Sequence, residues 1–172
     1  MTGVLGAVLA GGASSRFGSD KAKALFHGKA LIEHVISRLR RQVSDLVVVG
    51  RDYPGEASIP DRPAPGLGPL GGLCAALHHA DAGGYDAVLT SGCDLPELPL
   101  DLRDALGEGS AFVIGQPLLA VWPSALAGVL DLHLARSSDR SLRGWVALTG
   151  ARGVDLGPIW NVNRPTDIPP VQ

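Results

Sequence analysis

The chain has 172 residues, a length typical of one domain, and its 45% hydrophobic against 19% charged residues exclude an extended disordered chain. Its 15 basic and 17 acidic residues give a formal net charge of −2, so we expect no nucleic-acid partner, because such proteins usually carry a basic excess. No apolar run approaches the roughly 20 residues of a membrane span, so we expect no membrane partner either.

Short apolar runs alternate with amphipathic segments along the chain, a pattern typical of an α/β protein. The first two runs predict buried strands of a mostly parallel sheet: residues 3–10 are followed by Gly11 and Gly12, and residues 46–50 end in Gly50. Residues 31–44 carry apolar side chains at helical spacing, with charges on the opposite face. Further strands are expected at 87–90, 110–114, 118–122 and 159–162, and further helices at 71–82, 99–106, 124–135 and 141–148. Residues 51–69, rich in proline and glycine, are expected to be irregular.

We therefore predict a single domain, residues 1–172, in which helices cover both faces of a mostly parallel sheet. Ligands of such sheets bind beyond the carboxyl ends of the strands. The polar and glycine-rich segments that follow the predicted strands are consequently the candidate binding site.

The first such segment is LAGGASSRFGSDK, residues 9–21. Gly11 and Gly12 follow a buried strand, so backbone N–H groups can approach a ligand without interference from a Cβ atom. Arg16 adds a bidentate donor and Lys21 adds a compact positive charge. Together these groups predict an anion site, most naturally for a polyphosphate, although the spacing is not that of a Walker A loop. The alternative is an ordinary glycine turn with solvated charges.

Two later segments offer oxygen ligands. Asp94, in SGCDLP, follows a short apolar strand, and one carboxylate beside a polyphosphate suits Mg²⁺. A turn aspartate that caps a helix is the alternative. Asn161 and Asn163 would share one face of an extended segment and could bind a metal or a ligand, although a simple turn accounts for them equally well.

Other patterns are weaker. Residues 66–71 match G-x-G-x-x-G, but the preceding PDRPAP cannot form the strand that a dinucleotide-binding fingerprint requires. We interpret the segment as a loop entering a helix, either against a flat ligand or as a turn with no ligand. The two cysteines show neither metal spacing nor a disulfide framework, which predicts a reducing, cytoplasmic location. No pair of histidines has convincing metal spacing, and we expect His34 and His133 to be structural.

Several segments in this order resemble the molybdenum cofactor guanylyltransferases of the nucleotidyltransferase superfamily, and the resemblance covers nearly the whole chain. They are LAGGASSRFGSDKA at 9–22, GKALIEH at 28–34, GPLGG at 68–72, CDLP at 93–96 and NVNRP at 161–165. The resemblance implies a three-layer Rossmann-like fold and Mg²⁺-dependent transfer of GMP from GTP to the terminal phosphate of molybdopterin, with release of pyrophosphate. The implied partners are GTP and molybdopterin or molybdenum-molybdopterin, with other cofactor-biosynthesis or molybdoenzyme-chaperone proteins.

The resemblance also implies roles for individual residues. Arg16, Lys21 and Asp94 would be catalytic, Asp94 would hold the metal, Asp61 would lie at the guanine, and Asn161 and Asn163 would lie at the metal or pterin side. The predicted nucleotide-binding residues are Leu9, Ala10, Gly11, Gly12, Lys21, Asp61, Gly68 and Asp94. Gly50 stands where the family often has Asn.

The predicted chemistry needs no strong general base, because the attacking group is already an anionic phosphate. Repulsion between two anions opposes the reaction, and cationic side chains and backbone amides relieve it. Two alternatives are a related nucleotidyltransferase, specific for CTP or for a sugar 1-phosphate, and a non-catalytic molybdopterin-binding module. The presence of both Lys21 and Asp94 favours an enzyme, because a pure binding protein requires neither a metal carboxylate nor neutralisation of a leaving group.

Overall fold

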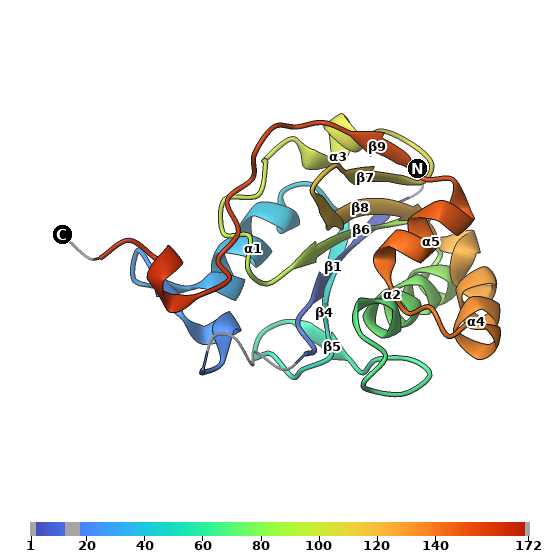
Figure 1. Cartoon of the computed structure of the whole chain (residues 1–172), viewed down its shortest axis with the longest axis horizontal. Helices are drawn as coiled ribbons and strands as arrows, with labels where there is room; N and C mark the ends of the chain where they lie inside the picture. Colours follow the sequence, from blue (N-terminus) through green and yellow to red (C-terminus); the bar gives the residue numbers. More distant parts are fainter. Residues whose placement is uncertain (1–2, 13–17, 171–172) are drawn as a thin grey trace.

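A seven-stranded mixed sheet forms the centre of the computed structural model, which describes residues 3–12 and 18–170 (Figure 1). The strand order is β5-β4-β1-β6-β8-β7-β9. Only β8 runs antiparallel to its neighbours, β6 and β7, whereas the other pairs in the sheet are parallel. The strands are β1 (Val4–Leu9), β4 (Asp45–Val49), β5 (Ala57–Ile59), β6 (Ala87–Gly92), β7 (Ala111–Val113), β8 (Gln116–Pro123) and β9 (Arg152–Val154).

Helices cover both faces of this sheet, which confirms the predicted three-layer α/β architecture (Figure 1). One face packs against α1 (Leu31–Arg40) and α3 (Leu102–Leu106). The other face packs against α2 (Pro69–Gly83), α4 (Ala127–Arg136) and α5 (Leu142–Thr149). The described residues also form the short 3₁₀ helices η1 (Lys21–Lys23), η2 (Ser124–Leu126) and η3 (Pro165–Asp167). None of the helices in the described part of the chain is long and apolar enough to cross a membrane.

The two-sided burial of the central strand β1 explains why its sequence is a continuous apolar run. Val4 and Val8 belong to the core under α1, whereas Leu5 and Ala7 belong to the core under α2. Side chains alternate between the two faces of a strand, so a strand covered on both faces needs apolar residues at both sets of positions.

The structure corrects several sequence-based expectations. No strand forms at 159–162; the last strand is instead β9, which pairs in parallel with β7. Residues 51–69 contain the short strand β5, and a two-stranded ribbon of β2 (Leu25–Phe26) and β3 (Lys29–Ala30) was not predicted. These strands have two or three residues each, too few for alternation of apolar and polar residues to reveal them. The helix predicted over 31–44 ends at Arg40.

Candidate active site

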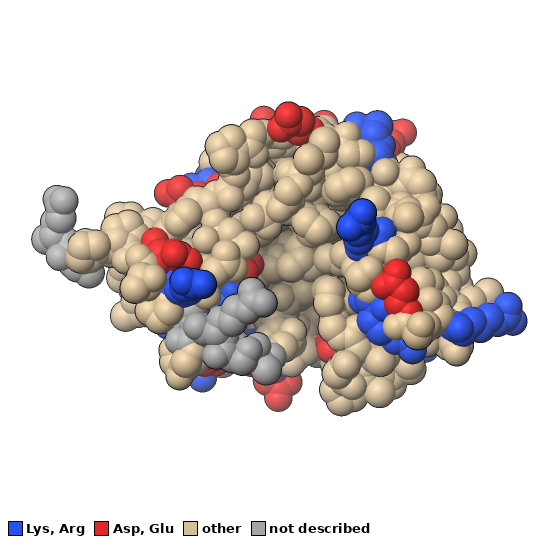
Figure 2. Space-filling view, in the orientation of Figure 1, with Lys and Arg blue, Asp and Glu red and all other residues tan. Residues whose placement is uncertain are grey.

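The predicted site residues gather at one edge of the sheet, as expected. Leu9, at the end of β1, pairs with Val49 of β4 on one side and with Gly92 of β6 on the other. Because the three strands are parallel, the segments that follow them meet at the same edge. The space-filling view shows the molecule hollowed near the centre of this face, where Figure 1 has β1, β4 and β6 (Figure 2).

The glycine turn after β1 lies directly against the end of β4. The Ala10 N–H donates to Val49 O over 2.9 Å, and Gly11 and Gly12 beyond it are exposed. Gly50 has φ +87°, and a Cβ atom there would lie 2.5 Å from Gly11 Cα. The two backbones therefore approach as closely as only glycine allows. This packing explains why position 50 is glycine in this chain, whereas the family that the sequence resembles often has Asn there.

Lys21 and Asp94, the two predicted catalytic residues that the structure describes, form an ion pair. Lys21 Nζ donates to Asp94 Oδ2 over 3.0 Å, and the two side chains are 18% and 17% exposed. A Cβ atom on Gly92 would lie 2.8 Å from Asp94 Oδ1, so glycine at the end of β6 leaves room for this carboxylate. The predicted cationic and acidic groups thus meet over the end of the central strands.

Arg51 and Asp20 form a second pair that the sequence did not single out. Both terminal nitrogens of Arg51 donate to the Asp20 carboxylate over 2.9 Å, and Arg51 Nε donates to Ala10 O over 3.1 Å. The hydrogen bond from Arg51 holds the pKa of Asp20 below its usual value. Asp20 also accepts from the Ala22 N–H and caps η1, the helical turn that begins at Lys21. Arg51 therefore ties the glycine turn to the segment that presents Lys21.

The Asp61 carboxylate lies among glycines. Ideal Cβ atoms on Gly11, Gly50 and Gly72 would lie 3.4, 3.0 and 3.6 Å from Asp61 Oδ1. Within residues 3–12 and 18–170, no hydrogen bond or ion pair is made by this carboxylate, and burial raises its pKa. A half-buried acceptor that no described residue satisfies suits a ligand that offers N–H donors.

The segment before α2 enters the helix as predicted. Gly68, with φ +62°, is the N-cap residue, and Pro69 occupies the first helical position. Arg62 N–H donates to Gly71 O over 3.1 Å and holds the loop against the first turn. The strand before it, β5, ends at Ile59, so the G-x-G-x-x-G pattern does not directly follow a strand. This supports the rejection of a dinucleotide fingerprint.

The two asparagines differ in their surroundings. Asn161 Oδ1 is buried and has no hydrogen-bond partner among the described residues. Val162 N–H donates to Asp94 O over 2.9 Å, which brings this segment beside the ion pair. Asn163 is exposed, and its backbone N–H donates to Asp167 Oδ2. Both asparagines flank this backbone contact, and Asn161 is the one whose side-chain oxygen is buried. Arg16 lies outside the described residues, and its role remains a prediction.

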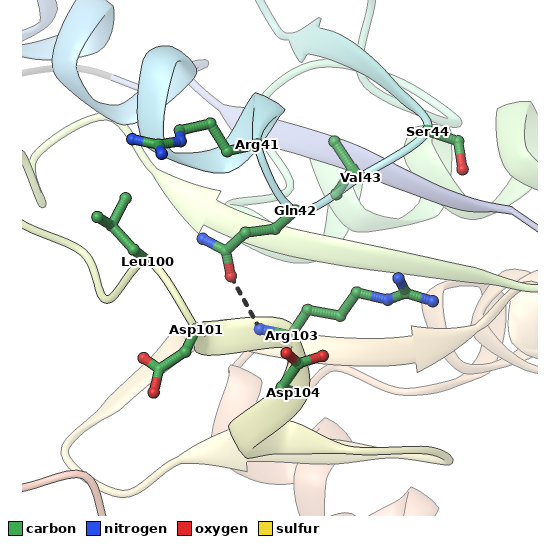
Figure 3. A pocket seen from close by; sticks show the side chains of 8 residues that line it. All are labelled: Arg41, Gln42, Val43, Ser44, Leu100, Asp101, Arg103 and Asp104. Carbon is green, nitrogen blue, oxygen red and sulfur yellow. Dashed lines mark hydrogen bonds between the residues drawn. The ribbon is translucent and has the colours of Figure 1, made fainter.

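A pocket at the opposite edge of the sheet has a different character. Its lining comes from the end of α1, the approach to β4 and the start of α3 (Figure 3). Gln42 Oε1 accepts from the Arg103 N–H over 3.0 Å across it. Ser44 lines this pocket, and its N–H donates to Val4 O at the amino end of β1. It is therefore remote from the carboxyl ends where ligands of such sheets bind.

Known proteins are similar to this chain over most of its length. Residues 6–153 match the family described as the MobA-like NTP transferase domain. A protein of Sinorhizobium fredii named molybdenum cofactor guanylyltransferase is 37% identical over an alignment that covers 94% of this chain and 87% of that protein.

Two solved structures share the fold. One, molybdopterin-guanine dinucleotide biosynthesis protein A from Archaeoglobus fulgidus, superposes with a TM-score of 0.72 at 24% identity over 95% of this chain and 94% of the other. The second, a Mycobacterium tuberculosis protein in complex with manganese, superposes with a TM-score of 0.60 at 15% identity over 94% and 92% of the two chains.

Proposed function

Since this chain belongs to the MobA-like NTP transferase family, we propose that it is a molybdenum cofactor guanylyltransferase, the activity for which its relatives at 31–37% identity are named. It is a nucleotidyltransferase of molybdenum cofactor biosynthesis. It transfers GMP from GTP to the terminal phosphate of molybdopterin and releases pyrophosphate. The observation that carries this proposal is the Lys21–Asp94 pair at the carboxyl ends of β1 and β6, next to the exposed glycine turn.

The reaction forms a bond between a molybdopterin phosphate oxygen and the α-phosphorus of GTP, and it breaks the bond from that phosphorus to the β-phosphate bridging oxygen. No proton has to leave the attacking oxygen when the terminal phosphate is ionised. The chain's task is to hold two anionic groups in line and to neutralise charge on the departing pyrophosphate. We assign that task to Lys21 and to the backbone N–H groups of Gly11 and Gly12, with Arg16 as a further predicted phosphate ligand.

We propose Mg²⁺ as the cation of this site. The donors present fit a hard, oxygen-seeking ion: the Asp94 carboxylate stands beside the segment that carries the buried, unpartnered carbonyl oxygen of Asn161. Asp94 and Asn161 would hold the ion, with phosphate oxygens and water completing its shell. When bound, Mg²⁺ supplies positive charge to the phosphates. The fold relative from Mycobacterium tuberculosis was crystallised with manganese, another divalent cation.

We propose Asp61 as the group that reads the base. Guanine presents two adjacent donors, its N1–H and its 2-amino group, and one carboxylate can accept from both. The Asp61 carboxylate is half-buried and accepts no hydrogen bond from the described residues. Asn163 and partner proteins of cofactor biosynthesis remain predictions of the sequence, as does a cytoplasmic location.

The direct test is formation of the guanine dinucleotide from GTP and molybdopterin by the purified chain, with pyrophosphate release measured in parallel. We expect both products to appear in equal amounts and only in the presence of a divalent cation. Preference for CTP over GTP with molybdopterin would instead identify a cytidylyltransferase. Product formation from a sugar 1-phosphate without molybdopterin would identify the other alternative.

A further inference from the structure

A cluster of three possible metal ligands lies outside the candidate active site, between α2 and α4. Cys74 and His78 stand one helical turn apart on α2, and Asp131 reaches them from α4. Their ligand atoms all lie within 4.8 Å of one another. Cys74 Sγ donates to Asp131 Oδ1 over 3.2 Å, and His78 Nε2 lies 2.8 Å from Asp131 Oδ2. The four-residue spacing of Cys74 and His78 was not recognised in the sequence, because the third ligand is 53 residues away from His78 in the chain.

This cluster is separated from the nucleotide site by the body of α2. A Cβ atom on Gly72 would point toward Leu9 and Asp61. Cys74 follows Gly72 by two residues, a rotation of about 200° around the helix axis, so it faces away from that site. It faces α4 instead, where its thiol meets Asp131. The cluster therefore has no part in the nucleotidyl transfer described above.

Hydrogen bonds through Asp131 join the three side chains of this cluster. The Asp131 carboxylate stands between a thiol and an imidazole. Burial, followed by the hydrogen bond to Asp131 and its negative charge, raises the pKa of the Cys74 thiol to about 12, although the positive charge of Arg62 opposes these effects. A divalent cation reverses this balance, because it binds the thiolate in place of the proton.

We propose that Cys74, His78 and Asp131 form a Zn²⁺-binding site that clamps α4 onto α2. Sulfur, imidazole nitrogen and carboxylate oxygen are the ligands Zn²⁺ takes, at about 2.0–2.3 Å. Binding releases the thiol proton to solvent and uses the lone pair of His78 Nε2, the ring's remaining proton residing on Nδ1. His78 and Asp131 are 26% and 43% exposed, so water reaches the fourth position of a tetrahedral ion.

Charge also favours this assignment. The thiolate and the carboxylate balance the two positive charges of Zn²⁺, so the loaded site is neutral. Arg62, which acts electrostatically on both Cys74 and Asp131, then meets no net positive charge. Because ligands from two helices join at one ion, metal binding should stabilise the packing of α4 against α2 and so the folded chain.

The test uses the full chain, freed of metal by a chelator and titrated with Co²⁺, a spectroscopic substitute for Zn²⁺. We expect one equivalent to give a thiolate-to-cobalt charge-transfer absorption band, which one equivalent of Zn²⁺ abolishes. The band should vanish in Cys74→Ala. In His78→Ala and Asp131→Asn the affinity for Zn²⁺ should fall by at least the roughly 10–100-fold that even loss of a second-shell partner costs. Zn²⁺ should raise the Tm of the wild type and not that of His78→Ala.

Two controls keep the result specific. His79→Ala removes an exposed histidine from the neighbouring position of α2 and should leave Zn²⁺ binding unchanged. Cys93→Ser removes the other thiol, which lies beside the active site, and should leave the cobalt band in place. The proposal is overturned if cobalt gives no thiolate band, if the band depends on Cys93, or if His78→Ala binds Zn²⁺ like the wild type. His78 is partly exposed, so this last variant should fold even if Cys74→Ala does not.

Discussion

Lys21 and Asp94 lie 73 positions apart in the sequence, and their side chains meet over 3.0 Å at the carboxyl ends of β1 and β6. Neither side chain is more than 18% exposed, and each charge offsets part of the cost of burying the other. We propose that each group changes its partner when a nucleotide binds. The ammonium can turn to phosphate oxygens, and the carboxylate can turn to a cation. In the role that we propose, the pair is ready to bind a metal-bound anion.

Replacing Asp94 tests its assigned role as metal ligand. In Asp94→Asn the amide keeps the shape and loses the charge, so we expect turnover at saturating GTP to fall by roughly 10²–10³-fold or more. The Mg²⁺ concentration for half-maximal rate should rise. Glu97→Gln removes an exposed carboxylate three residues further along and should change neither quantity. A wild-type rate in Asp94→Asn at limiting Mg²⁺ would contradict the assignment. An unchanged circular dichroism spectrum would show that a loss of rate does not come from misfolding.

Lys21 should act mainly on the chemical step. If its charge meets negative charge that develops on the departing pyrophosphate, Lys21→Ala should lose about 2.7–4 kcal/mol of transition-state stabilisation, as loss of one oxyanion donor does. Lys23→Ala is the matched control, because that side chain is 79% exposed two residues away. Measurement of kcat and KM for GTP should show the loss in Lys21→Ala and wild-type values in Lys23→Ala. Equal kcat/KM values for wild type and Lys21→Ala would show that the ammonium has only a structural role.

Arg51 is expected to act as a positioning residue through the segments that it joins. Arg51→Lys cannot reproduce the two bonds to Asp20 together with the bond to Ala10 O, so kcat/KM should fall and the Tm should drop. The pair is partly exposed, and its share of the free energy of unfolding should be about 1 kcal/mol or less.

The pH dependence of this stability has a defined sign. The pKa of Asp20 is lowered in the fold by its hydrogen bond with Arg51, so the pair stabilises the chain above the ordinary aspartate pKa of 3.8. That contribution is lost as the pH falls through the lower pKa of the folded state. The Tm difference between wild type and Arg51→Lys should therefore be largest at neutral pH and shrink in acid. A difference that is constant with pH would show that the pair does not stabilise the fold in this way.

The sequence could predict that the candidate residues share one edge of the sheet, but it could not predict which of their side chains form pairs. The apolar runs before Gly11 and Asp94 end abruptly, and parallel strands bring such ends to one edge. The partners of Arg51 and of Cys74 depend on which strands and helices become neighbours, and no local spacing encodes that. Position 50 illustrates the same point. Only glycine fits there because the backbone of Gly11 lies so close, and that contact follows from the pairing of β1 with β4.

Asp61 gives a prediction in the absence of ligand. Burial raises its pKa above the usual 3.8, so the protonated carboxyl stabilises the fold below that value and the contribution is lost as the pH rises through the folded-state pKa. At neutral pH the ionised group therefore costs stability, and Asp61→Asn should have a Tm equal to or above that of the wild type. The difference should disappear in acid. A lower Tm for Asp61→Asn at neutral pH would show that the carboxylate has a stabilising partner in the free protein.

The same carboxylate should determine the choice of nucleotide. In Asp61→Ala the guanine N1–H and 2-amino group lose their acceptor at a half-buried position. Leaving these donors unpaired should cost about 1–3 kcal/mol, so kcat/KM for GTP should fall by roughly 5–150-fold. ITP lacks the 2-amino group and ATP lacks both donors, so their values should fall less and the gap to GTP should narrow, with kcat for GTP little changed. Asp52→Asn changes an exposed aspartate two residues after Gly50; it is the control and should keep the wild-type order. The measurement is kcat/KM for GTP, ITP, ATP and CTP on the three proteins, and an unchanged order in Asp61→Ala would show that Asp61 does not read the base.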